Sequence, residues 1–227
     1  MKIKLLFDCN SKLIHKPLNE EVNGFLNNVL GDGNKYHGTF SRYSVSSMQG
    51  GRMDKDGVLN FPNGGYVFVS SDDSEFMVTL LKGLAAKQKN LYVLDMKYKG
   101  MELCDFKVNE RFDLVRSISP ILISDGKKAV TFNDDNFFEL VREKSIKKLI
   151  KCGYDEKLVN TLEINPFHPE KYKTKMVEIN GVKNIGSRVM FCISGDKTVR
   201  KALYELGIGK CTGFGFGAVS INNNDNY

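Results

Sequence analysis

The stretch KIKLLFDCNSKLIHKPLNEEVNGFLNNVL, residues 2–30, determines the fold class of the first part of the chain. Its first six residues are rich in apolar side chains, which indicates a strand, and a polar connection follows. Glu20 and Glu21 occupy the first turn of a predicted helix, where acidic side chains are favourable. The apolar positions at helical spacing are Val22, Phe25, Leu26, Val29 and Leu30. Gly31-Asp32-Gly33 ends this pattern, so the stretch predicts a strand followed by a helix.

The same alternation of strands and helices continues to residue 100. Residues 43–48 and 66–70 are β-branched, aromatic or alternating, and each predicts a strand. Asp72-Asp73-Ser74 predicts the N-cap of a second helix, and residues 91–98 alternate as a strand again. The order is β-α-β-β-α-β, which is the ferredoxin-like or split βαβ unit. We place its end at Lys99-Gly100.

The second half of the chain approximates the same order. Its expected strands are residues 114–124, 175–181, 188–195 and 218–221, and its expected helices begin after Asp134-Asp135-Asn136 and after Asp196. The fold class is therefore α+β, with two tandem ferredoxin-like (RRM-like) domains and antiparallel sheets. The domains are expected at residues 1–100 and 101–227.

Composition restricts the class of protein but does not select a function. The 227 residues include 33 Lys+Arg and 27 Asp+Glu, a formal net charge of +6, and 41% are hydrophobic. Such a chain can bury a core, which excludes a disordered, collagen-like or disulfide-stapled protein. The basic balance is compatible with an anionic partner, although many basic proteins bind none.

Five cysteines lie far apart in the chain and form no CxxC pair, which argues against a zinc knuckle. They are Cys9, Cys104, Cys152, Cys192 and Cys211. Their odd number fits a reducing compartment. No apolar run reaches the length of a signal-peptide core or a membrane span. We therefore expect a cytoplasmic protein with no membrane contact and no metal or other cofactor.

The most distinctive segment is the glycine-rich loop, GIGKCTGFGFG at residues 207–217, in which five of eleven residues are glycine. Glycine permits positive φ and lets a polyanion approach main-chain N–H groups. Lys210 adds a charge, and the rings of Phe214 and Phe216 are candidates for stacking on bases. A hairpin with bulges is the alternative. A dinucleotide site or a P-loop does not fit, because no helix follows and no Gly-Lys-Ser/Thr occurs.

This loop resembles the signature near the C-terminus of the Cas6 family of CRISPR endoribonucleases. Gly207-Ile208-Gly209 and Gly215-Phe216-Gly217, separated by five residues, fill that signature without a gap. The chain length, the two ferredoxin-like halves and the strand near Ser119-Pro120 are also similar. The resemblance implies metal-independent cutting of CRISPR precursor RNA within its repeats, leaving a 5′-hydroxyl and a 2′,3′-cyclic phosphate. It implies CRISPR repeat RNA as the partner, and other CRISPR effector subunits and a homodimer are further partners to test.

The segment KYHGTFSRY, residues 35–43, contains His37 among basic and aromatic residues. The family places its catalytic histidine just after the first helix, so the resemblance selects His37 over His15 and His168. A histidine can act as general acid or base at neutral pH when a 2′-OH attacks the adjacent phosphorus.

A nearby cation would stabilise the negative charge of that transition state, and Arg42 and Lys35 are candidates. If the segment is extended, Tyr36 points away from His37, which favours Tyr43 or Arg42 as helpers. Ser41 is a further candidate for a phosphate contact. The predicted catalytic set is His37, Arg42 and Tyr43.

The predicted helix after Asp135 carries several lysines on one face. A solvated helix face is the ordinary alternative, but together with the glycine-rich loop these lysines predict an RNA-binding surface. The predicted RNA-binding residues are Gly207, Gly209, Lys210, Gly215, Phe216, Gly217, Lys144, Lys148 and Lys151.

Two other functions fit parts of the sequence. One is a non-catalytic RNA-binding relative that holds a guide RNA as a structural subunit, since the paired fold by itself cuts nothing. His37 in its basic, tyrosine-rich segment distinguishes the enzyme from this relative. The other is a small-molecule sensor built on ferredoxin-like domains, and the glycine-rich loop with Lys210 argues against it.

Overall fold

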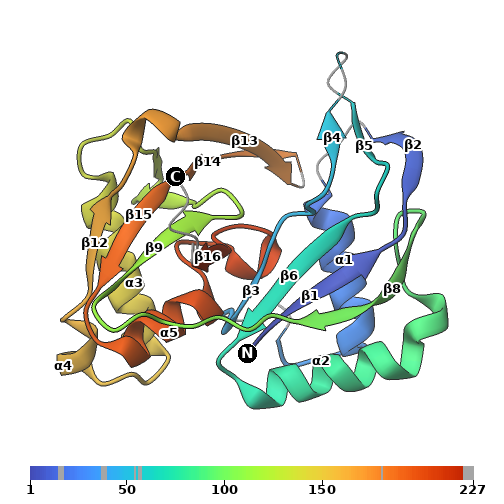
Figure 1. The fold of residues 1–227 in the computed structure, drawn as a ribbon, viewed down its shortest axis with the longest axis horizontal. Helices are drawn as coiled ribbons and strands as arrows, with labels where there is room; N and C mark the ends of the chain where they lie inside the picture. The colour runs from blue at the N-terminus through green and yellow to red at the C-terminus, as the bar shows by residue number, and fades with distance from the viewer. Residues whose placement is uncertain (15–17, 37–39, 54, 56–57, 180, 222–227) are drawn as a thin grey trace.

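The computed structural model describes the chain except residues 15–17, 37–39, 54, 56–57, 180 and 222–227 (Figure 1). The main elements of its first half are β1 (Lys2–Phe7), α1 (Asn19–Leu30), β3 (Tyr43–Val45), β6 (Tyr66–Ser71), α2 (Ser74–Lys87) and β8 (Met96–Leu103). Their sheet has the strand order β3-β6-β1-β8-β7, and all neighbours are antiparallel. This is the predicted β-α-β-β-α-β unit, with its first and third strands at the centre.

The second half repeats this architecture. Its main elements are β9 (Phe112–Ser117), α3 (Phe137–Lys151), β12 (Glu163–Pro166), β15 (Met190–Ser194), α5 (Lys197–Leu206) and β16 (Val219–Ile221). When the four main strands of each unit are numbered 1 to 4 along the chain, both sheets have the order 2-3-1-4. This order is β3-β6-β1-β8 in the first sheet and β12-β15-β9-β16 in the second. The α+β class and the tandem ferredoxin-like fold are therefore confirmed.

Shorter elements are inserted into both units. They are β2 (Asn10–Ile14), β4 (Arg52–Met53), β5 (Leu59–Phe61), β7 (Tyr92–Val93), β10 (Ile123–Asp125), β11 (Lys128–Val130), α4 (Glu156–Val159), β13 (Lys173–Ile179), β14 (Val182–Arg188) and the 3-10 turns η1 (Gln88–Asn90), η2 (Pro169–Lys171) and η3 (Thr212–Phe214). The β13–β14 hairpin extends from the second domain towards the first (Figure 1). Its tip contributes to the site described below.

Several expected strands have different limits in the structure. A two-residue turn at Leu94 and Asp95 divides residues 91–98 into β7 and the start of β8, with Leu94 at φ 52°. The strand expected at 114–124 ends at Ser117, and Arg188 belongs to β14 rather than to the strand after it. β8 continues to Leu103, three residues past the expected domain boundary. The division of the chain at residue 100 stays a prediction.

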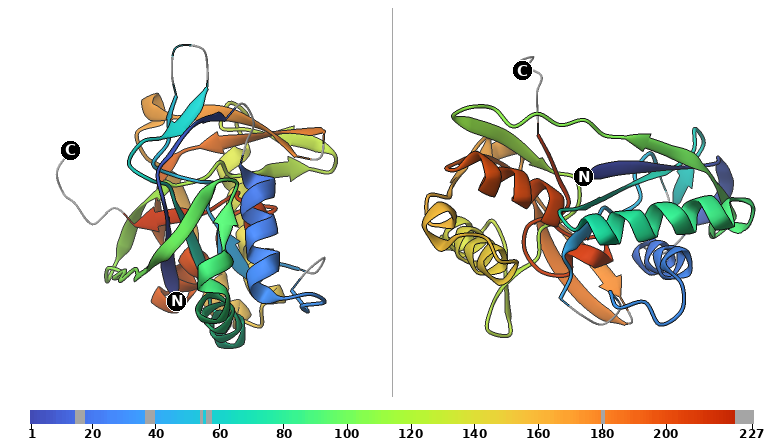
Figure 2. Two further views of the ribbon diagram at one scale, coloured as in Figure 1. Left: turned by 90° about the vertical axis from the view of Figure 1, so that its right-hand side faces the viewer. Right: turned by 90° about the horizontal axis from the view of Figure 1, so that it is seen from below.

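Each sheet buries one face under its own pair of helices. Ile3, Leu5 and Phe7 alternate along β1 and pack in one core with the apolar faces of α1 and α2. α3 and α5 cover the second sheet in the same way. Figure 1 shows β1, β6 and β9 in front of α1 and α3, and Figure 2 gives the side views. The helices thus lie on one side of the molecule, and both sheets turn their other faces to the opposite side.

The two domains are joined by polar contacts that involve the first strand. The Nζ atom of Lys2 donates to the carbonyl oxygen of Val219 at 2.5 Å. The N-terminal ammonium of Met1 lies 2.5 Å from Oε1 of Glu205 on α5. Both contacts connect the N-terminal end of the first domain to elements of the second.

Candidate nucleic-acid interface

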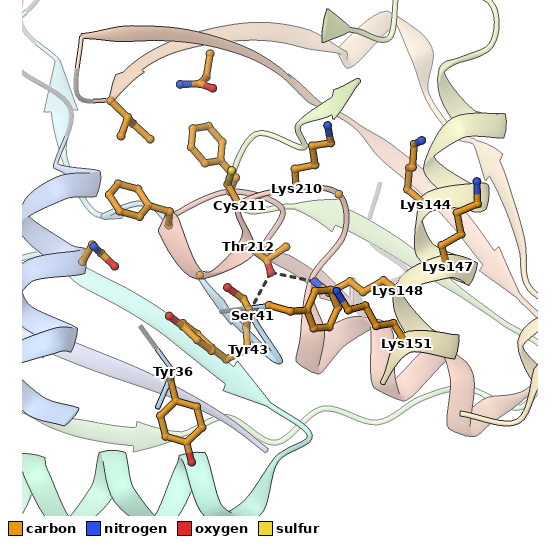
Figure 3. Close-up of a pocket in the computed structure, with 18 of the residues that line it drawn as sticks. Tyr36, Ser41, Tyr43, Lys144, Lys147, Lys148, Lys151, Lys210, Cys211 and Thr212 are labelled. Carbon is orange, nitrogen blue, oxygen red and sulfur yellow. Dashed lines mark hydrogen bonds between the residues drawn. The ribbon is translucent and has the colours of Figure 1, made fainter. Parts of the chain in front are cut away.

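A cavity of about 860 Å³ lies at the junction of the two domains. Its lining comes from α1, α3, the tip of the β13–β14 hairpin, the glycine-rich loop, and the residues Tyr36, Phe40, Ser41 and Tyr43. Figure 3 shows Tyr36, Ser41 and Tyr43 on one side and the lysines of α3 on the other. The described lining residues include no Asp or Glu. One wall is therefore aromatic and the other basic, a combination that suits bases and phosphates of a nucleic acid.

The basic wall brings together lysines that are far apart in the sequence. Lys144 and Lys151 of α3 and Lys210 of the glycine-rich loop line the same cavity. The Lys151 ammonium lies 4.3 Å from the centre of the Phe40 ring, and the Lys210 ammonium is hydrogen-bonded to Ser124. The placement of these three lysines on one surface agrees with the sequence prediction. Their role in binding RNA stays a prediction.

Lys148 has a different environment from the other lysines, because only 8% of the residue is exposed. Its Nζ atom donates to the carbonyl oxygens of Leu206 at 2.6 Å and Gly207 at 3.2 Å, and to Oγ1 of Thr212 at 2.9 Å. The Thr212 hydroxyl in turn donates to the carbonyl oxygen of Tyr43 at 3.0 Å. The sequence grouped Lys148 with the phosphate-binding lysines, but its buried ammonium anchors the glycine-rich loop instead.

Replacing Lys148 with methionine is expected to destabilise the protein by about 1–3 kcal/mol, because buried carbonyl oxygens lose their donor. Burial lowers the pKa of Lys148 from 10.5 to about 8. Between these two pH values the unfolded wild type binds more protons than the folded one, so its stability rises with pH. The methionine variant lacks this contribution. The difference in the free energy of unfolding between the wild type and Lys148→Met, here called the stability gap, should therefore be larger at pH 9 than at pH 7.

Urea denaturation at both pH values measures that gap. Lys144→Met, on the same helix and half-exposed, is the matched control and should show no widening. A gap that is equal at pH 7 and pH 9 would contradict the buried charge assigned to Lys148.

The glycines of the loop are required by contacts within the protein. Gly207, Gly209, Gly215 and Gly217 all have positive φ, between 64° and 83°. A Cβ atom on Gly217 would lie 1.9 Å from the carbonyl oxygen of Ile208. A Cβ atom on Gly215 would lie 2.4 Å from Nδ2 of Asn19, which donates to the carbonyl oxygen of Phe214 at 3.0 Å. The close approach that the sequence assigned to an RNA backbone is thus made by the chain itself.

Gly217→Ala should lower the free energy of unfolding by about 3 kcal/mol or more, because it combines a positive φ of 64° with a backbone clash. Gly153→Ala is the matched control, since Gly153 has a φ of 88° but no atom within 4 Å of the added Cβ. The control should lose about 1 kcal/mol, the cost of the backbone conformation alone. Denaturant titrations give both values, and equal losses would refute the packing explanation.

Phe216 differs from its sequence prediction. Its side chain is fully buried and packs with Leu122, which precedes β10, and with Val177 of β13. A ring enclosed in this way has no face for a base, so its assignment to base stacking is corrected. Phe214 is only half-buried and lines the cavity, which leaves it as the loop ring that a base can reach.

The predicted catalytic segment borders the cavity. His37 lies outside the described residues, but its neighbours in the description, Tyr36 and Phe40, both line the cavity. Tyr43 lines it as well, and its ring stacks on Phe76 with the centroids 4.5 Å apart. Burial raises the pKa of Tyr43, against the effect of a hydrogen bond to Ser41. The phenol therefore stays protonated at neutral pH and can donate a hydrogen bond.

Arg42 is engaged elsewhere. Its guanidinium forms a bidentate contact with Asp72, with Nε at 3.2 Å and Nη2 at 2.8 Å from the two carboxylate oxygens. Asp72 also accepts a hydrogen bond from the Tyr154 hydroxyl of the second domain at 2.9 Å. Arg42 is not among the residues that line the cavity. Its charge is thus balanced by Asp72 near the domain junction, and its catalytic role stays a prediction.

Several residues of the site were not selected from the sequence. Asn19 and Thr212 fix the glycine-rich loop to the first domain, and Asn184 at the hairpin tip lines the cavity. Among the described residues, no group of three or more His, Cys, Asp or Glu side chains gathers to hold a metal ion. No helix within the described ranges is long and apolar enough to cross a membrane.

Comparison with known proteins relates this chain to one family. The family model described as CRISPR associated protein Cas6, C-terminal, matches residues 104–221. The CRISPR-associated endoribonuclease Cas6 1 of Methanocaldococcus jannaschii is 25% identical over 190 residues, which cover 79% of this chain and 72% of the relative.

Two solved structures have the same fold as this chain. A Cas6-related protein from Pyrococcus furiosus has a TM-score of 0.83 at 18% identity and covers 99% of both chains. A structure described as an RAMP protein binding different RNA substrates has a TM-score of 0.82 at 17% identity, over 98% of this chain and 100% of the other.

Proposed function

Because the chain belongs to the Cas6 family of CRISPR-associated proteins, we propose that it is an endoribonuclease that cuts CRISPR precursor RNA within its repeats. The Methanocaldococcus relative is named an endoribonuclease, and the RAMP protein of similar fold is described as binding RNA. The observation that carries the proposal is the cavity between the domains, whose described lining combines an aromatic wall with a lysine wall and includes no acid.

In the proposed reaction the substrate provides its own nucleophile. The 2′-OH attacks the adjacent phosphorus, the bond to the 5′ oxygen breaks, and the products are a 2′,3′-cyclic phosphate and a 5′-hydroxyl. His37 removes the 2′ proton or protonates the departing 5′ oxygen. The lysine wall stabilises the negative charge that grows on the phosphate in the transition state. The Tyr43 phenol donates a hydrogen bond to a phosphate oxygen or to the sugar.

An assay with end-labelled repeat RNA in excess EDTA tests the proposal directly. Cleavage at one position of the repeat, with a cyclic phosphate on the upstream product, is the expected result. Tight binding without cleavage, with and without added Mg²⁺, would instead support the non-catalytic relative. Size-exclusion chromatography with and without RNA tests the predicted homodimer, and co-purification tests the predicted effector subunits.

Lys210 offers a test of the basic wall. Lys210→Ala should weaken binding of the repeat RNA by about fivefold and reduce the salt dependence of log K by roughly one counterion. Lys82→Ala is the control, because Lys82 is exposed on α2 and does not line the cavity. Affinities measured at several salt concentrations give both slopes. If the two variants have the same slope, Lys210 does not contact a phosphate.

A further inference from the structure

The central strand β6 carries a sequence pattern that the cavity does not use. Residues 65–69 read Gly65-Tyr66-Val67-Phe68-Val69. RNA-recognition motifs, which have the same β-α-β-β-α-β architecture, carry a similar pattern on their sheet: Lys/Arg, Gly, an aromatic residue, Gly/Ala, Phe, Val, any residue, and an aromatic residue. This chain matches it at four positions and differs at Gly64, Val67 and Ser71. The two aromatic positions that stack on bases are both retained.

The structure places these two rings on the face of the first sheet opposite the helices. Val67 and Val69 are 1% and 0% exposed and belong to the core under α1 and α2. Side chains alternate along a strand, so Tyr66 and Phe68 project from the other face, where both are half-buried. Their ring centroids are 5.5 Å apart at an angle of 82°. This face is turned towards the viewer in Figure 1.

Lysines of the neighbouring strand accompany the rings. The Lys4 ammonium lies 4.8 Å from the centre of the Tyr66 ring, and the Lys2 ammonium lies 5.1 Å from that of Phe68. Lys2 is buried and donates to Val219, so it supports the sheet. Lys4 is partly exposed and pairs with Glu102 at 3.0 Å, an exposed pair that contributes little and that a phosphate can replace. The face therefore offers two rings and one available cation.

We propose that this face is a second RNA-binding surface, on which Tyr66 and Phe68 stack on bases of a single-stranded segment while Lys4 contacts its phosphates. The ligand is single-stranded because the base faces in a duplex are already covered by neighbouring base pairs. None of these residues lines the cavity, so the surface is a separate site. The proposal rests on the proposed function only in that the ligand is RNA, since stacking requires no cleavage.

The chain contains no tryptophan, which allows a local test. Phe68→Trp keeps a stacking ring and introduces one fluorophore at the proposed site. A short, unstructured RNA of adenine and cytosine alone should quench its emission in a saturable way. Tyr92→Trp is the matched control, because Tyr92 is an exposed aromatic residue on β7 of the same sheet, and its emission should not change. Binding of this RNA without quenching at position 68 would overturn the proposal.

Affinity measurements complete the test. Tyr66→Leu and Phe68→Leu should each weaken binding of the same RNA by about tenfold, while thermal melting confirms that the variants are folded. Unchanged affinity in folded variants would show that the rings only cover the sheet. Because the binding readouts do not depend on cleavage, an inactive enzyme would leave this result interpretable.

Discussion

Replacing His37 with alanine is expected to slow single-turnover cleavage of repeat RNA by about 100-fold or more, the usual contribution of a general acid or base. Tyr36, the described residue that precedes His37 in the sequence, lines the cavity together with the lysines of α3 and the loop. Affinity for the RNA should change little, because phosphate contacts dominate it.

His168→Ala is the matched control. His168 is a partly exposed histidine beside Glu170, with 2.8 Å between Nδ1 and Oε1, and it does not line the cavity. This variant should cleave at the wild-type rate. Near-normal cleavage by His37→Ala, measured with enzyme in excess over RNA, would remove His37 from the mechanism while leaving the RNA-binding role of the cavity intact.

A single 2′-deoxy nucleotide on the 5′ side of the scissile phosphate should abolish cleavage. The proposed reaction has no other nucleophile, so the loss is complete rather than partial. Binding should survive, because one hydroxyl is a small part of the interface. The same substitution one nucleotide away serves as the control and should leave the rate nearly unchanged. Product analysis on a denaturing gel separates the two RNAs.

Two results would contradict this mechanism. Cleavage of the deoxy-substituted RNA at the normal position would mean that water or an enzyme group attacks the phosphorus. Activity that disappears in EDTA and returns with a divalent cation would mean that a metal ion participates. Either result would leave the family assignment unchanged and would redirect the search for catalytic groups to other residues around the cavity.

The order of strands and helices was predictable because the chain carries strong periodicities. The apolar residues of α1 recur at helical spacing, and Asp73 and Asp196 accept hydrogen bonds from the first backbone N–H groups of α2 and α5 as capping residues do. The turn that separates β7 from β8 was not predictable, because its left-handed position is occupied by Leu94 rather than by glycine or asparagine.

The site was predictable only as a set of segments. The lysine face of α3 follows from helical spacing, but nothing in that spacing distinguishes Lys148 from Lys144. The difference arises from Leu206, which lies 58 residues further along the chain and whose carbonyl oxygen accepts a hydrogen bond from the Lys148 ammonium. The same holds for Arg42, because its partner Asp72 and the Tyr154 hydroxyl come from distant segments. Such contacts depend on how the domains pack together, which no local pattern specifies.

The Thr212 hydroxyl has a consequence for how RNA enters the site. It accepts a hydrogen bond from Lys148 of the second domain and donates one to the carbonyl oxygen of Tyr43 in the first. The Thr212 hydroxyl therefore links the two domains (Figure 3). Rotation of one domain against the other would break the bond from Thr212 to Tyr43. The conformational entropy of bringing the walls together is therefore lost during folding rather than during binding. We therefore expect that domain closure does not limit the rate at which RNA associates with the cavity.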